Sequence, residues 1–266
     1  MTGARVACVQ LASRDGENAA ARMDCIRALL RDTRPDLVLL PELWSVGFFQ
    51  FHRYAEHAEP LDGPTLRAVG ELARDLGAHV HGGSIVERRE DGRLSNTSLL
   101  VGPGGELLLA YRKRHLFGYR SSEADLLAPG EEAGVAETPF GRVGMTTCYD
   151  LRFPELYLEL VAQGAELVLV ASAWPHTRLD HWRLLARARA LENLVYLVAC
   201  NAAGTDAGVR LAGHSVVVDP WGKILAEADG DESVLVSELD PGLVKEVRAE
   251  FPVLDDRLER AGVQTA

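Results

Sequence analysis

Three side chains that could take part in nucleophilic chemistry follow short apolar stretches of the chain. Glu42, Lys113 and Cys148 come one or two residues after stretches with the composition of buried strands, which are residues 37–40, 107–111 and 142–147. In open α/β sheets, ligands bind at the carboxyl ends of the strands, because loops converge there while the sheet holds them rigidly. We therefore expect the three side chains to share one site.

These residue types together suffice for acyl transfer through a thioester. A thiol becomes a nucleophile when a nearby cation or base favours its thiolate, and a fixed lysine can also stabilise an oxyanion. A glutamate can move the proton. Taken singly, each residue has an ordinary structural explanation: Cys148 as an inert buried thiol, Lys113 as part of the basic run 112–115, and Glu42 as a cap or surface carboxylate.

Strands and helices that alternate along the chain would position these residues. Expected strands cover residues 5–11, 37–40, 79–86, 95–101, 107–111, 142–147, 167–171, 195–200 and 216–218, and two more near Ile224 and Val234 should close the sheet after the last of these. Expected helices cover residues 18–31, 65–76, 153–161, 180–193 and about 243–259. The turn residues 102–105 predict a hairpin, and Cys148 falls in a strand-to-helix turn. The alternation predicts an α/β fold.

Composition limits the class of protein. The 266 residues are 47% hydrophobic and 25% charged, which is typical of a globular protein, and we expect a single domain over residues 1–266. A net charge of −11 disfavours binding to nucleic acid. The sequence has no signal-peptide pattern and no apolar stretch of membrane-spanning length, so we expect a cytoplasmic protein that does not bind membranes. The four cysteines are far apart and should be free thiols.

Three sequence blocks resemble the catalytic blocks of a known enzyme family. They are Pro-Glu-Leu-Trp at residues 41–44, Tyr-Arg-Lys-Arg-His-Leu-Phe at 111–117 and Cys-Tyr-Asp-Leu-Arg-Phe-Pro-Glu at 148–155. In this order they resemble the nitrilase superfamily of carbon-nitrogen hydrolases, in particular its omega-amidase-like branch, and residues 96–98, 187–193 and 213–220 match as well. The resemblance implies an α-β-β-α sandwich that pairs into a homodimer or higher homo-oligomer. It also implies catalysis by Glu42, Lys113 and Cys148 without a metal or organic cofactor.

The resemblance assigns four further residues. Glu123, which precedes Pro129-Gly130, matches a second glutamate of the family, and the backbone N–H of Tyr149 would complete the oxyanion site. Arg152 would bind a carboxylate of the substrate, and Trp174 would line the pocket. The implied function is hydrolysis of a small carboxamide, with omega-amides of dicarboxylic acids as the narrower hypothesis. Gly118-Tyr119-Arg120 departs from the omega-amidase pattern, which weakens the transfer of its substrate.

Other interpretations remain open at this stage. Arg152 could instead pair with Glu155, and Trp174 could be a core residue. Trp44, Phe48 and Phe49 could form another pocket wall or pack together, and Arg120 could add a second anion contact or point into water. An N-carbamoyl amine hydrolase or a nitrilase of the same superfamily would use the same catalytic residues. A non-catalytic α/β interaction module is the alternative outside enzymes. A serine hydrolase is not supported because residues 82–85 lack the last glycine of a G-x-S-x-G motif, and the histidines form no H-E-x-x-H zinc motif.

Overall fold

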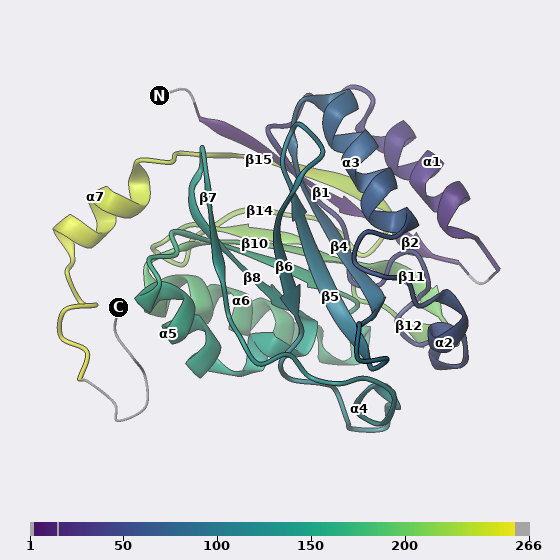
Figure 1. The fold of residues 1–266 in the computed structure, drawn as a ribbon. Helices are drawn as coiled ribbons and strands as arrows, with labels where there is room; N and C mark the ends of the chain where they lie inside the picture. The colour runs from purple at the N-terminus through teal and green to yellow at the C-terminus, as the bar shows by residue number, and fades with distance from the viewer. Residues whose placement is uncertain (1–2, 15, 259–266) are drawn as a thin grey trace.

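Two β-sheets pack face to face between two layers of helices in the computed structural model, which describes residues 3–14 and 16–258 (Figure 1). Within those residues, the first sheet has the spatial order β15 (Ser233–Leu239), β1 (Ala4–Gln10), β3 (Leu37–Leu39), β4 (His79–Arg88), β5 (Leu94–Val101) and β6 (Leu107–Arg112). The second has the order β14 (Ile224–Glu227), β13 (Val216–Val218), β10 (Tyr196–Asn201), β9 (Leu167–Ser172), β8 (Gly141–Thr147) and β7 (Val135–Thr138). The α-β-β-α sandwich is therefore confirmed.

Two pairs of helices form the outer layers. Helices α1 (Ala19–Leu30) and α3 (Pro64–Leu76) cover the first sheet, and α5 (Pro154–Ala162) and α6 (Leu179–Asn193) cover the second (Figure 1). Asn18 caps α1 by accepting a hydrogen bond from the N–H of Ala21 at 2.9 Å. Helix α3 begins with Pro64 and ends at Gly77, whose φ of +62° suits a residue without a side chain. No helix among the described residues has the length and apolar character needed to span a membrane.

The smaller elements connect these layers. They are β2 (Ala12–Ser13), β11 (Ala203–Asp206) and β12 (Val209–Arg210), the 3₁₀ turns η1 (Phe51–Arg53), η2 (Cys148–Arg152) and η3 (His176–Arg178), and helices α2 (Tyr54–His57), α4 (Glu123–Leu126) and α7 (Leu243–Glu250). The sequence prediction missed β2, β7, β11, β12, α2 and α4, all of which are short. The helix expected over 243–259 ends at Glu250, shortly before Pro252, and residue 259 lies outside the described residues.

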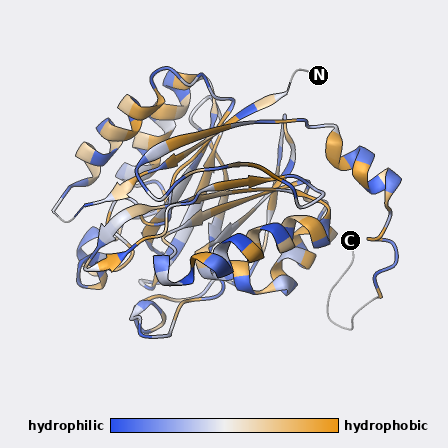
Figure 2. Cartoon of the chain, turned by 180° about the vertical axis from the view of Figure 1, so that it is seen from behind, coloured by the Kyte–Doolittle hydropathy of each residue, from blue (hydrophilic) through white to orange (hydrophobic). Residues whose placement is uncertain are grey.

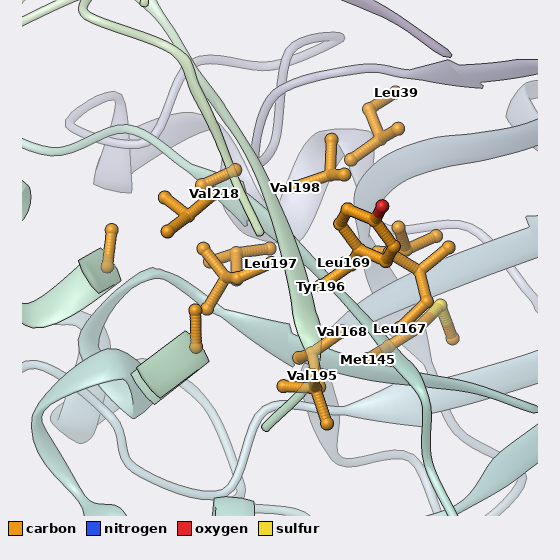
Figure 3. Close-up of a cluster of buried hydrophobic side chains, with 14 of the residues drawn as sticks. Leu39, Met145, Leu167, Val168, Leu169, Val195, Tyr196, Leu197, Val198 and Val218 are labelled. Carbon is orange, nitrogen blue, oxygen red and sulfur yellow. The ribbon is translucent and has the colours of Figure 1, made fainter. Parts of the chain in front are cut away.

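The core fills both the space between the sheets and the space beneath the helices. Figure 3 shows Tyr196 and Val198 of β10 on the side facing Leu39 of the other sheet, whereas Leu197 and Val218 point the opposite way, as alternation along a strand requires. The strands are coloured largely as hydrophobic in Figure 2, and the helices alternate hydrophobic and hydrophilic segments along their length. Side chains from both sheets belong to one buried apolar cluster, and the burial of this surface holds the two sheets against each other.

The last strand differs from its predicted place. The stretch near Val234 was expected to close the same sheet as the stretch near Ile224, but β15 instead pairs antiparallel with β1 of the first sheet. Val234 and Val236 pack on the helix side of that sheet, and Leu235 and Leu239 pack on its inner side. This pairing covers the edge of β1, which would otherwise leave its backbone groups unpaired.

The topology brings the three predicted catalytic positions to one region. Strand β3 is parallel to β4, and β5 is antiparallel to both β4 and β6. Strands β3 and β6 therefore run in the same direction, and their carboxyl ends lie on the same side of the first sheet. Strand β8 of the second sheet ends beside β5, where the Ser98 and Thr147 hydroxyl groups are 2.8 Å apart. Residues that follow β3, β6 and β8 therefore meet between the sheets.

Candidate active site

Lys113 lies at the centre of a buried group of charged side chains. Its Nζ donates to Glu42 Oε1 at 2.8 Å and to both carboxylate oxygens of Glu123 at 2.9 Å. The amide of Asn96 donates to the same two carboxylates, at 2.8 Å for Glu42 and 3.0 Å for Glu123. All four side chains are at most 1% exposed. One ammonium group and one amide thus hold two carboxylates within a few ångströms of each other.

Backbone contacts fix the two ends of this group. The N–H of Ala173 donates to Glu42 Oε2 at 3.1 Å, and the N–H of Phe117 donates to Glu123 Oε2 at 2.7 Å. Lys113 continues the β-ladder, since its N–H donates to the carbonyl of Asn96 at 2.8 Å. These bonds leave the carboxylates little rotational freedom, as preorganised catalysis requires.

Cys148 lies in a strained turn at the end of β8. Its φ of +48° is in the left-handed region, which residues with a Cβ seldom adopt. Asp150 holds the turn: its Oδ2 accepts from the N–H of Thr147 at 3.0 Å and from the hydroxyl of Tyr111 at 2.7 Å, and its Oδ1 accepts from the N–H of His115 at 2.9 Å. The hydrogen bonds of the buried Asp150 therefore stabilise the turn that carries the Cys148 thiol.

The electrostatics keep the resting thiol protonated. Burial is the largest cause that raises the pKa of Cys148, the Glu42 carboxylate raises it further, and the Lys113 cation only partly opposes them. A nearby cation was expected to lower this pKa, but burial and a carboxylate in contact with the thiol outweigh the lysine. A thiol in this environment needs a base at the moment of attack, and Glu42 is in hydrogen-bonding contact with it.

The carboxylates and the lysine shift one another's pKa values. Burial raises the pKa of Glu42, Lys113 lowers it, and Glu123 raises it again, with a net upward shift. Burial lowers the pKa of Lys113, but the carboxylates of Glu123 and Glu42 outweigh this and raise it above its usual value. Lys113 therefore remains a cation, while Glu42 accepts protons more readily than an ordinary glutamate does.

Cys148 lines a pocket that is partly open to solvent. Tyr149, Arg152 and Trp174, the three predicted substrate-binding residues, all line it. The remaining lining residues are Phe48, Phe49, Phe117, Ala173, Pro175 and Arg178. The guanidinium of Arg152 lies 4.7 Å from the centre of the Trp174 ring, and this ring is only 2% exposed, so Trp174 is both a core residue and a pocket wall.

Several residues lie apart from the predicted arrangement or were not assigned beforehand. Trp44 packs beneath α1 and α3 rather than in this pocket, and Arg120 is exposed over the Tyr119 ring. Asn96 was noted only as a sequence match, and the role of Asp150 in fixing the turn was not anticipated. No three His, Cys, Asp or Glu side chains of the described residues are placed to hold a metal ion.

Comparison with known proteins places this architecture in a family. The family model for carbon-nitrogen hydrolases matches residues 5–249. The chain is 41% identical to 2-oxoglutaramate amidase of Paenarthrobacter nicotinovorans over 260 residues, which cover 95% of this chain and 88% of that protein. Nit3 of Saccharomyces cerevisiae, a member of branch 10 of the nitrilase superfamily, has a TM-score of 0.83 and 35% identity, and the match covers 95% of each chain.

A further solved structure is a variant of the amidase from Nesterenkonia sp. AN1 with the acetamide moiety of fluoroacetamide on its active-site cysteine. It has a TM-score of 0.80 and 27% identity, and the match covers 97% of each chain. The match of the family model over most of the chain, together with relatives named as amidases, is decisive for the class of enzyme. This chain belongs to the carbon-nitrogen hydrolase family of the nitrilase superfamily, and it acts on amides.

Proposed function

We propose that this enzyme hydrolyses the omega-amide of a dicarboxylic acid, with Cys148 as nucleophile and a thioester as intermediate. The observation that carries the proposal is the buried group in which Lys113 binds Glu42 and Glu123 while Glu42 contacts the Cys148 thiol. This group provides a nucleophile, a base and a fixed cation at the end of one pocket. We further propose that residues 1–266 act as one carbon-nitrogen hydrolase domain.

The first half of the reaction forms the thioester. The Cys148 sulfur attacks the carboxamide carbon as its proton passes to Glu42, whose raised pKa suits it to accept a proton from a neutral thiol. The negative charge that develops on the carbonyl oxygen is stabilised by the Lys113 ammonium and the backbone N–H of Tyr149. Glu42 then gives its proton to the leaving nitrogen, and ammonia departs.

The second half returns the enzyme to its resting state. Glu42 takes a proton from a water molecule, which attacks the thioester carbon, and the same cation and N–H stabilise the second oxyanion. The carbon–sulfur bond breaks, the thiolate regains the proton from Glu42, and the carboxylic acid product leaves. Glu123 keeps Lys113 in place and raises the pKa of Glu42.

The pocket supports a substrate with a negative charge at its far end. Arg152 lines the pocket, is half-buried, and presents a planar fork of donors that matches a carboxylate. The alternative partner Glu155 does not form an ion pair with it in the described part of the chain. The relative named 2-oxoglutaramate amidase acts, by its name, on a compound of this class.

The test is release of ammonia from a panel of amides, nitriles and N-carbamoyl amines by the wild type and Cys148→Ala in parallel. We expect release that depends on Cys148 and is fastest for omega-amides of dicarboxylic acids, including 2-oxo acids. Faster turnover of nitriles or N-carbamoyl amines would instead assign one of the other activities of the superfamily. Full activity of Cys148→Ala would exclude Cys148 as the nucleophile.

We also propose that two copies pair through the helical layer of α5 and α6. Leu184 and Leu191 on α6 are 69% and 50% exposed, and Trp221, which precedes the Gly222 that contacts Leu191, is 41% exposed. Large apolar side chains gathered on one outer face favour association. Light scattering of the wild type should give the mass of a dimer or a multiple of it, and Leu184→Glu should shift the mass toward that of the monomer. A monomeric wild type would contradict the proposal.

A further inference from the structure

A second arginine, Arg178, shares the pocket with Arg152 and Cys148. It ends the 3₁₀ turn η3, and its carbonyl accepts a hydrogen bond from Trp174 Nε1 at 2.8 Å. Its guanidinium carbon lies 5.7 Å from the centre of the Phe117 ring and 5.5 Å from that of the Tyr119 ring. The backbone contact ties Arg178 to the pocket wall, and the aromatic contacts place its cationic end beside the residues that follow Lys113.

Neither arginine of the pocket is neutralised by the protein. Among the residues that the structure describes, no carboxylate lies within 4.0 Å of either guanidinium. Arg152 has instead a contact of 3.2 Å with His181 Nδ1. Elsewhere in the chain, Arg112, Arg183 and Arg189 each bind a glutamate. Two unpaired guanidinium groups around one small pocket, in a chain with 39 acidic residues, form a site of concentrated positive charge.

Such a pair is unfavourable when the pocket is empty. Burial lowers the pKa of Arg152, and the neighbouring Arg178 cation lowers it further. An anion bound between the two guanidinium groups would remove this repulsion and would receive hydrogen bonds from both. Because Cys148 lines the same pocket as the two arginines, this anion would be another part of the molecule whose amide is cleaved.

We propose that Arg178 is a specificity-determining residue that, with Arg152, binds the carboxylate of the substrate and selects charged monoamides over neutral ones. This inference rests on the proposed function, because it places the reacting amide at Cys148. Arg152 presents its guanidinium over the Trp174 side of the pocket, and Arg178 presents its own beside Phe117. A carboxylate has about four acceptor sites on its two oxygens and one guanidinium fills two of them, so two arginines can bind the same carboxylate together.

The experiment compares glutaramate, a monoamide with a carboxylate, with the neutral pentanamide. In Arg178→Gln, KM for glutaramate should rise about 10- to 100-fold, which is the effect of losing a charge-assisted hydrogen bond. The kcat/KM for pentanamide should stay within about twofold, and Arg178→Lys should recover part of the loss. Arg120→Gln is the matched control, because Arg120 also lies over the Tyr119 ring, at 5.3 Å, but is exposed outside the pocket.

A purely structural role for Arg178 would give a different pattern. If Arg178 only packs against Phe117 and Tyr119, its loss would impair both amides equally, and that result would overturn the inference. An unchanged KM for glutaramate in Arg178→Gln would overturn it as well. A wild type that cleaves pentanamide but not glutaramate would contradict both the substrate class and the role of Arg178.

Binding without turnover separates the inference from the proposed function. Glutarate, the dicarboxylate product, should protect Cys148 from iodoacetamide, as measured by mass spectrometry of its peptide. The half-protecting concentration should rise about tenfold or more in Arg178→Gln and stay unchanged in Arg120→Gln. An unchanged concentration in Arg178→Gln would overturn the inference even if the enzyme proved to be an omega-amidase. Normal protection with no hydrolysis of any omega-amide would instead overturn the proposed function alone.

Discussion

Replacing Glu123 with Gln should lower the pKa of Glu42, because it removes a negative charge bound to the same lysine. The oxygens of Glu42 and Glu123 lie 2.8 Å and 2.9 Å from Lys113 Nζ. The two oxygens are therefore about 6 Å apart at most, and at that distance two charges repel by about 3 kcal/mol with an effective dielectric constant of about 20. This corresponds to about two pKa units. Lys113 would also be left to pair with Glu42 alone, which acts in the same direction.

The assay is the pH dependence of kcat/KM, whose acidic limb reports ionisation of the base in the free enzyme. In the wild type this limb should lie above pH 4.5, the usual pKa of a glutamate, because burial and Glu123 raise the pKa of Glu42. In Glu123→Gln it should move down by about one to two units. Glu87→Gln is the control, since Glu87 is also buried but binds Arg112 and Thr97. A limb that stays in place or moves up in Glu123→Gln would refute the electrostatic argument.

Three further predictions concern the thiol, its turn and the lysine. Because burial and then Glu42 raise the pKa of Cys148, the rate of its alkylation by iodoacetamide should keep rising with pH, by about tenfold per unit, without levelling off near pH 9, whereas a plateau at the pKa of an ordinary thiol would contradict the assignment. Asp150→Asn should lower the free energy of unfolding in urea by about 1–3 kcal/mol, because the fully buried carboxylate that accepts from the N–H groups of Thr147 and His115 and from the Tyr111 hydroxyl loses its charge. An unchanged urea midpoint would show that Asp150 does not stabilise the turn. Lys113→Met should cost about 3–5 kcal/mol at neutral pH by leaving two buried carboxylates without a cation. Unfolding measured at lower pH should recover part of this loss, because burial raises the pKa of Glu42 in the folded state; a loss that does not depend on pH would count against this explanation.

The catalytic group was predictable because its members follow buried strands. The apolar stretches before Glu42, Lys113 and Cys148 identify β3, β6 and β8, and a strand end is a place where loops converge. Glu123 was found only through the resemblance, because no local pattern links a residue of the four-residue helix α4 to Lys113. A contact of this kind depends on the path of a loop, which local periodicity does not determine.

The pairing of distant segments was the part that local patterns could not supply. The sequence of strand β15 is that of an ordinary edge strand. Its antiparallel partner β1 lies more than 200 residues earlier in the chain, and local patterns do not show that β1 has a free edge. The roles of Asp150 and Arg178 were likewise hidden. Both are common surface residue types, and only the fold places the first beneath the Cys148 turn and the second at the pocket wall.

The most direct test of the account is the mass of the enzyme during turnover. Rapid acid quenching after mixing with an omega-amide, followed by mass spectrometry, should reveal a covalent acyl group on the peptide that contains Cys148, with loss of one ammonia from the substrate. Cys148→Ala should show no such adduct, and hydroxylamine should remove the adduct from the wild type, as expected of a thioester. Turnover without any adduct on Cys148, or an adduct that persists in Cys148→Ala, would contradict the assignment of Cys148 as the nucleophile.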